Sequence, residues 1–354
     1  MAYDSKLASL QVVRALAAWT VVFHHYVQLY NENSTAAIAR FFWAHGRVGV
    51  DVFFVLSGFV MCLVLQKSTK GPVTFFIDRV FRFAPAYWFF SAAVVACLSI
   101  FPRGFFYTTY NLQSLVKTFL FIPGLNPSGV GYVPVLTVGW TLNFEMFFYA
   151  VLACCMALSR RWALAIFLVL FAAFPFYYPI NAPLAIIGRD PLLHEFWAGA
   201  LLAILWTGGL GSAVRDFPKL SLSASAAFLL FGIIMLLRDH PGIFACSVVV
   251  FALACEPHLR RDSLPVRAFV HLGEISYSTY LAHCVVIGIA IHLTGKGLSP
   301  WYQTAMLLTT IAGTYVVSLL SYRWLENNRY LVALRAGVVR FSSRTNSAKL
   351  LQSE

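Results

Sequence analysis

The chain has 354 residues, of which 60% are hydrophobic and only 11% are charged. A soluble domain usually has about 25% charged residues, so this composition excludes the soluble fold classes and predicts a membrane protein. The net charge of +12 does not indicate nucleic acid binding, because the basic residues cluster at the ends of apolar runs, where positive charges set membrane topology.

Apolar runs of about 20 residues recur without strict alternation, which predicts membrane-spanning helices and not barrel strands. We expect an all-α, polytopic transmembrane helix bundle of about ten spans in residues 1–326 and a cytoplasmic C-terminal tail in 327–354. The first run exceeds the length of a signal peptide and holds ionisable groups, so we expect it to be retained. The expected spans are 7–29, 48–66, 84–101, 138–158, 161–179, 189–207, 219–237, 241–256, 269–294 and 301–326.

The distribution of basic residues predicts the orientation. If the N-terminus is cytoplasmic, 17 Lys and Arg residues fall on the cytoplasmic side and seven on the opposite side. This bias predicts an N-in, C-in topology, which requires an even number of spans.

The first run carries two ionisable side chains, Arg14 and His25. Eleven positions correspond to about three helical turns, so both side chains share one face of the helix, about 16 Å apart. Ionisable groups within a span usually face the bundle interior or a water-filled cavity and mark function.

Two carboxylates, Asp51 and Glu145, fall near the outer ends of the second and fourth spans, at the expected depth of His25. A histidine flanked by carboxylates can be held in one tautomer and can take a proton from a hydroxyl. For Asp51 a structural role as a charge at a helix start is equally consistent with its position. Aromatic neighbours surround Glu145, which favours function because unpaired burial is costly.

Arg79 and Arg82 follow the second span on the cytoplasmic side, three positions apart. Neighbouring guanidiniums on one turn suit a phosphate group, although ordinary positive-inside charge explains them equally well. At the end of the last span, Arg323 and Glu326 are expected to form a structural ion pair. The seven cysteines show no spacing that suits zinc, so no metal site is expected.

Six stretches, in order, resemble the motifs of the acyltransferase 3 family of integral membrane O-acyltransferases. The resemblance extends over most of the chain. The short length, without a fused extracytoplasmic domain, is most similar to the members that act on exopolysaccharide. The matching stretches are 14–25, 46–59, 79–87, 140–145, 273–283 and 322–326.

The resemblance implies transfer of an acyl group, most often acetyl, from cytoplasmic acyl-CoA to a hydroxyl of an extracytoplasmic or lipid-linked glycan. It also implies residence in the bacterial cytoplasmic (inner) membrane. His25 would act as general base or as transient acyl carrier. The site residues so implied are His25, Glu145, Arg14 and Asp51 for catalysis, Arg79, Arg82 and Arg14 for the donor, and Trp140, Tyr280 and His283 for the substrate.

Two other functions are consistent with an ionisable stripe in a polytopic protein. One is a transporter or flippase of a glycan or lipid intermediate, with a His/Arg/Glu relay, although matched broken helices are missing. The other is a non-catalytic membrane scaffold. The expected partners are membrane lipid and a hydroxyl acceptor, together with polysaccharide biosynthesis proteins or a second copy of the chain, and no nucleic acid.

Overall fold

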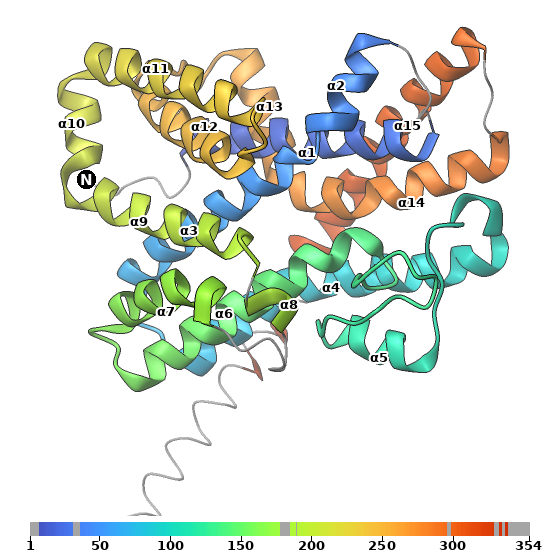
Figure 1. Ribbon diagram of the computed structural model, residues 1–354, viewed down its shortest axis with the longest axis horizontal. Helices are drawn as coiled ribbons and strands as arrows, with labels where there is room; N and C mark the ends of the chain where they lie inside the picture. Colours follow the sequence, from blue (N-terminus) through green and yellow to red (C-terminus); the bar gives the residue numbers. More distant parts are fainter. Residues whose placement is uncertain are drawn as a thin grey trace, which may run out of the picture.

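The computed structural model describes residues 7–30, 36–177, 185–188, 190–295 and 299–328, with 333–334 and 337–338. All regular elements in these ranges are helices, which confirms the predicted all-α class (Figure 1). The expected tail, 327–354, lies almost entirely outside the described residues.

Fifteen α-helices follow one another along the described ranges, and five short 3₁₀ or π turns flank them. The α-helices are α1 (Ala8–Tyr30), α2 (Ala37–His45), α3 (Val48–Lys67), α4 (Pro72–Ile100), α5 (Leu112–Phe119), α6 (Trp140–Leu158), α7 (Ala163–Tyr177), α8 (Ala185–Gly188), α9 (Leu192–Leu205), α10 (Gly211–Asp216), α11 (Pro218–Leu236), α12 (Pro241–Cys255), α13 (Leu264–Glu274), α14 (Ser276–Thr294) and α15 (Pro300–Ser321). The short turns are η1 (Pro102–Gly104), η2 (Thr137–Gly139), η3 (Trp206–Leu210), η4 (Glu256–His258) and η5 (Tyr322–Glu326).

Eight helical segments within the described ranges are long and apolar enough to cross a membrane, which makes this a multipass membrane protein. They are formed by α3, α4, α6, α9, α11, α12, α14 and α15 with their flanking turns. Helices α1 and α7 occupy the two other expected spans, and α7, with 15 residues, is shorter than the eight spanning segments, each of which has at least 18.

Two expected span boundaries were wrong. Helix α4 begins at Pro72, twelve residues before the expected start at 84, with proline in the first turn, where its missing N–H costs no helical bond. Arg79 and Arg82 therefore lie within this long helix, ahead of the expected start of the span. The expected span 269–294 is two helices, because the chain breaks at Ile275 between α13 and α14.

Helices α3 and α14 form the centre of the bundle, since most of their residues are buried, whereas few residues of α11 and α15 are buried. Helix α3 packs against α1, α9 and α12, and α14 packs against α1, α4 and α15. Figure 1 shows α11 on the outer side of α12. The helices that carry the expected site residues thus contact one another at the centre.

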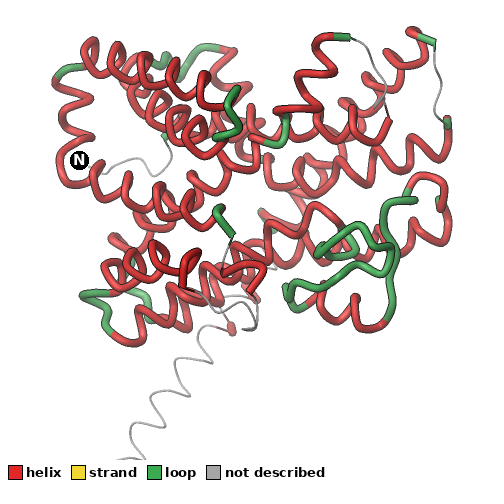
Figure 2. The backbone as a smooth tube through the Cα atoms, in the orientation of Figure 1, coloured by secondary structure: helices red, strands yellow, loops and turns green. Residues whose placement is uncertain are grey.

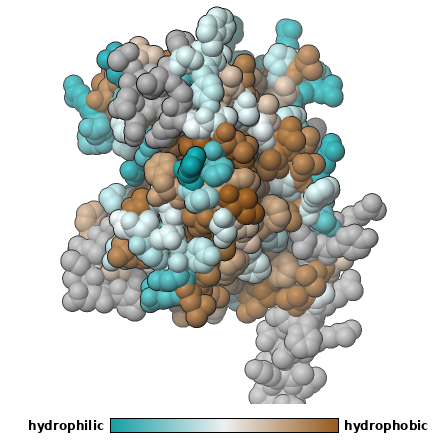
Figure 3. Space-filling model, turned by 90° about the vertical axis from the view of Figure 1, so that its right-hand side faces the viewer, coloured by the Kyte–Doolittle hydropathy of each residue, from teal (hydrophilic) through white to brown (hydrophobic). Residues whose placement is uncertain are grey.

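The long connection between α4 and α6 lies at the same end of the molecule as α2 and the end of α14 (Figure 2). Its short helix α5 begins with a capping box, in which Asn111 Oδ1 accepts from the Ser114 N–H at 2.8 Å. Figure 3, which views the molecule from this end, shows polar residues gathered at the centre of a largely apolar face.

Candidate active site

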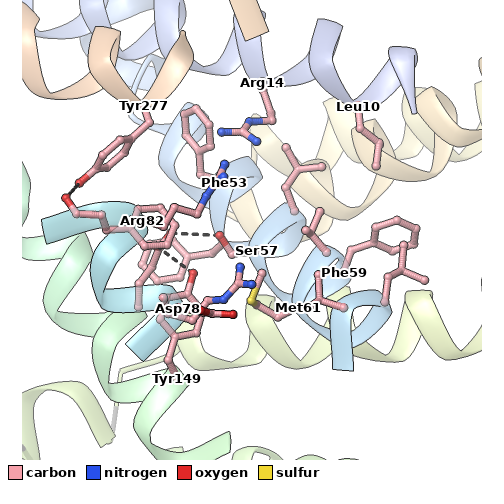
Figure 4. Close-up of a pocket in the computed structure, with 18 of the residues that line it drawn as sticks. Leu10, Arg14, Phe53, Ser57, Phe59, Met61, Asp78, Arg82, Tyr149 and Tyr277 are labelled. Carbon is pink, nitrogen blue, oxygen red and sulfur yellow. Dashed lines mark hydrogen bonds between the residues drawn. The ribbon is translucent and has the colours of Figure 1, made fainter. Parts of the chain in front are cut away.

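A cavity of about 640 Å³ runs between α1, α3, α4, α6 and α14, within the size range of ligand sites (Figure 4). Its lining follows α3 from Val50 to Lys67, a distance of about 26 Å at 1.5 Å per residue. Most of the wall is apolar side chains such as Phe53, Phe59 and Met61. A long, narrow and mostly apolar ligand would fit this shape.

One end of the cavity is strongly basic. Lys67 and Lys70 from the end of α3 and the following turn lie there with Arg79 and Arg82 from α4. Lys70 pairs with the buried Asp78 carboxylate, and the Arg82 guanidinium lies 5.6 Å from the centre of the Phe83 ring. Among the described residues that line this end, four are basic and one is acidic, which favours an anionic ligand.

Arg14 lies further into the cavity, where α1 meets the start of α14. Its Nε donates to Ser276 Oγ at 3.3 Å, at the residue where the chain resumes a helix after Ile275. Figure 4 shows Arg14 and Arg82 extending toward each other from α1 and α4. Glu145 and Glu326 are the carboxylates whose charges act on Arg14.

Glu145 lines the same cavity and both of its carboxylate oxygens have donors. Ser57 Oγ donates to Oε1 at 3.0 Å, and Tyr149 OH donates to Oε2 at 3.1 Å. This pairing satisfies a charge that would otherwise be costly to bury. Ser57, Tyr149 and the two lysines were not expected as site residues, although Tyr149 is one turn from Glu145 on the same helix face.

The expected contact between His25 and the carboxylates was wrong. The His25 ring lies beside His283, with 3.1 Å between His25 Nδ1 and His283 Nε2, and Nδ1 is also 3.1 Å from the Val21 carbonyl oxygen. His25 does not line the cavity. The cavity ends at Val50, next to Gly49, which packs against Val21, and His25 is one helical turn beyond Val21.

Tyr280 forms the wall between the cavity and the two histidines. Its side chain lines the cavity, and its ring centre lies 6.0 Å from that of His283 and 6.1 Å from that of Phe53. Its hydroxyl donates to the Val138 carbonyl at 2.9 Å and accepts from Thr141 at 3.1 Å. These two bonds hold the ring in place.

Asp51 and Trp140 point elsewhere. Asp51 is buried against α9, where its carboxyl hydrogen bonds with that of Glu195, and it neither lines the cavity nor contacts His25. Trp140 packs edge-on against Phe144, with 5.5 Å between ring centres, and does not line the cavity either. Asp51 and Trp140 therefore lie outside the cavity that Arg14, Arg79, Arg82, Glu145 and Tyr280 line.

A second, polar cavity of about 240 Å³ shares Arg14 and Arg82 with the first. Glu326 lines it and accepts from Ser278 Oγ at 2.5 Å. The expected ion pair with Arg323 does not form between these described residues, because η5 is a π turn that leaves Arg323 exposed.

Among the described residues, one group of side chains could bind a metal ion: His25, His283 and Cys284, whose ligand atoms lie within 4.8 Å of one another. Cys284 Sγ is 3.4 Å from His283 Nε2. The hydrogen bond from His25 Nδ1 to Val21 argues against metal binding through that nitrogen, because a carbonyl can only accept and Nδ1 must then carry a hydrogen.

The chain is similar to a group of acyltransferases. A sequence model described as an acyltransferase domain matches residues 7–321. The exopolysaccharide production protein ExoZ of Rhizobium meliloti (strain 1021) is 31% identical over 290 residues, which cover 79% of this chain and 88% of ExoZ.

Two further relatives match most of the chain. The putative membrane-bound transacylase BcsY of Komagataeibacter xylinus is 28% identical over 333 residues, covering 86% of this chain and 81% of BcsY. The acyltransferase MdmB of Streptomyces mycarofaciens is 25% identical over 352 residues, covering 89% of this chain and 87% of MdmB. No solved structure gives a significant match.

Proposed function

Because this chain belongs to the acyltransferase 3 family of membrane O-acyltransferases, we propose that it transfers an acyl group, most often acetyl, from cytoplasmic acyl-CoA to a hydroxyl of a glycan. The acceptor is an extracytoplasmic or lipid-linked glycan, and the protein resides in the bacterial cytoplasmic membrane. The name of ExoZ, an exopolysaccharide production protein, supports an exopolysaccharide as the acceptor.

The single observation that carries the donor assignment is the shape and charge of the large cavity. Its basic end, with Lys67, Arg79 and Arg82, suits the phosphates of CoA, because guanidiniums bind phosphate through paired hydrogen bonds. The apolar length of about 26 Å suits the pantetheine arm. The thioester at the end of that arm would then lie near Thr141 and Tyr280.

His25 is the group we assign to the chemistry. As general base it takes the proton of the acceptor hydroxyl while the hydroxyl oxygen attacks the thioester carbonyl carbon. The C–S bond then breaks, and the CoA thiolate takes from His25 the proton that the hydroxyl gave up. As transient carrier, His25 instead attacks the thioester carbonyl carbon and the C–S bond breaks, so that CoA leaves as a thiolate. The acceptor hydroxyl oxygen then attacks the acyl group, the bond from the acyl carbon to His25 breaks, and the proton of the hydroxyl passes to the CoA thiolate. Either route requires Tyr280 to swing aside, because its ring stands between the cavity and the histidines.

Transfer can be tested on the purified protein in detergent, with [1-¹⁴C]acetyl-CoA and a glycan fraction extracted from source cells that lack the gene. We expect label to appear in the glycan with the wild type and not with His25→Ala. Detergent abolishes any gradient, so a transporter would give no such transfer. Uptake by vesicles without acetyl-CoA binding or transfer would show that the enzyme assignment is wrong. Glycan acylation that persists in cells carrying His25→Ala would favour the scaffold.

A further inference from the structure

His283 is fully buried on α14 and its two ring nitrogens have different partners. Nδ1 lies 3.2 Å from the carbonyl oxygen of Thr279, one turn earlier in the same helix. Nε2 lies 3.1 Å from His25 Nδ1 and 3.4 Å from Cys284 Sγ, and the thiol is also a donor. His283 does not line the cavity. A ligand bound in the cavity therefore does not reach it, although the resemblance implied a role in substrate binding.

The partners of the two rings determine which nitrogens carry hydrogen. A carbonyl only accepts, so His283 Nδ1 carries the hydrogen donated to Thr279 and its Nε2 presents a lone pair. His25 Nδ1 carries the hydrogen shared between the Val21 carbonyl and that lone pair. The remaining nitrogen of His25, Nε2, is therefore the one with a free lone pair.

We propose that His283 is a positioning residue, which fixes the His25 ring and its tautomer so that His25 Nε2 faces the reacting groups. The inference rests on the proposed function of His25. When His25 Nε2 gains a proton or an acyl group, the ring becomes cationic and its Nδ1–H becomes a stronger donor. The His283 lone pair, held in place by Thr279, receives that hydrogen bond in a buried setting, where such bonds are strongest.

Two substitutions of His283 separate this role from simple packing. His283→Gln places its amide oxygen near the position of Nε2, where it can accept from His25 Nδ1–H. His283→Asn instead places its polar atoms near Nδ1 and leaves His25 without the acceptor. Both variants are polar, but Asn is one methylene shorter than Gln, so the melting temperature of each variant is measured to separate a packing defect from loss of the acceptor.

The experiment measures kcat and the acetyl-CoA KM of both variants in the detergent assay, with the same glycan fraction. We expect His283→Asn to lower kcat about 10- to 100-fold, the range typical for loss of the partner that orients a functional histidine. The acetyl-CoA KM should change by less than about twofold, because His283 lies outside the cavity. His283→Gln should recover most of the lost kcat.

Three outcomes would overturn the proposal. The first is wild-type kcat in His283→Asn, and the second is equal loss in both variants while their melting temperatures and acetyl-CoA binding match the wild type. The third is one bound zinc per chain by elemental analysis of the purified protein, because the histidines would then be metal ligands. Wild-type activity in His25→Ala would instead show that His25 is not the catalytic group, so this variant tests the proposed function independently of His283.

Discussion

Gly58 on α3 and Gly199 on α9 approach so closely that neither helix leaves room for a side chain on the other. A Cβ atom on Gly58 would lie 2.1 Å from the Phe196 carbonyl oxygen, and one on Gly199 would lie 2.0 Å from that of Val55. Both contacts are with backbone, which cannot turn away as a side chain can. The preceding residue, Ser57, bonds to Glu145 in the cavity, so this contact between helices also fixes one wall of the site.

We predict that Gly58→Ala destabilises the protein, since α3 and α9 must separate to admit the methyl group. Overpacking a core typically costs about 1–3 kcal/mol, and a clash with backbone places this substitution at the upper end. The melting temperature of the purified protein in detergent measures the effect. Gly208→Ala is the matched control, because a Cβ there meets open space. Equal melting temperatures for the two variants would contradict the prediction.

Arg79→Ala and Arg82→Ala should each raise the apparent KM for acetyl-CoA about tenfold or more and leave kcat nearly unchanged. A contact with a remote phosphate stabilises the ground state and the transition state alike, so its loss appears in KM. Steady-state kinetics with acetyl-CoA measure both constants. Arg161→Ala serves as the control, since Arg161 lies over the Trp162 ring and does not line the cavity. An unchanged KM for acetyl-CoA in Arg79→Ala and Arg82→Ala would show that these arginines do not bind the phosphates of CoA.

Glu145→Gln should lower both stability and kcat. Ser57 and Tyr149 both donate to Glu145, so the NH₂ group of the new amide would face one of these donors and leave it without an acceptor. The substitution also removes a negative charge that acts on Arg14. Leaving a buried polar group without its partner costs about 1–3 kcal/mol. Thermal unfolding and kcat should be measured together. Adding Ser57→Ala should restore part of the melting temperature, because the amide no longer faces that donor, and a purely additive loss would speak against this pairing.

Tyr280→Leu should broaden the use of acyl donors. It removes the ring that closes the cavity and both hydrogen bonds that hold the ring, so the apolar end of the cavity becomes longer. One methylene in an apolar pocket is worth about 1–3 kcal/mol, so the kcat/KM ratio of butyryl-CoA to acetyl-CoA should rise by about tenfold or more. Tyr277→Leu is the control, because it makes the same replacement at another tyrosine that lines the cavity, and it should leave this ratio unchanged. A ratio that does not move in Tyr280→Leu would exclude this residue as the stop for the acyl chain.

The helical class and the inward placement of Arg14 and Glu145 followed from simple patterns, whereas the family resemblance implied that both residues share a site with Arg79 and Arg82. Runs of apolar residues predict spans, and charged side chains within spans turn inward because lipid excludes them. Such patterns fix depth to within a turn or two when the ends of a helix lie at the membrane surface. The depth of Glu145 could not be predicted in this way. The residues before α6, such as Val135 and Leu136, are buried, so α6 starts inside the protein and not at its surface.

Asp51 shows a second limit. Helix α3 is apolar on all sides, so its sequence gives no sign of which face meets the cavity and which meets α9. The structure turns Val50 and Phe53 to the cavity and Asp51 to Glu195, a partner far away in the sequence. The pairing of His25 with His283 is also a contact between distant residues, and periodicity within one helix cannot predict it.

The ring of Tyr280 lies between the cavity and the two histidines, and this position affects how well the protein prevents ions from crossing the membrane. In the proposed reaction the two substrates approach from opposite sides of the membrane, and an open path between them would let protons and ions leak across. A barrier of closely packed aromatic rings that opens only to pass a small neutral group keeps the two aqueous compartments insulated during each cycle. Under the proposed function, an acyl group would then cross from an internal donor to an external acceptor without dissipating the proton-motive force.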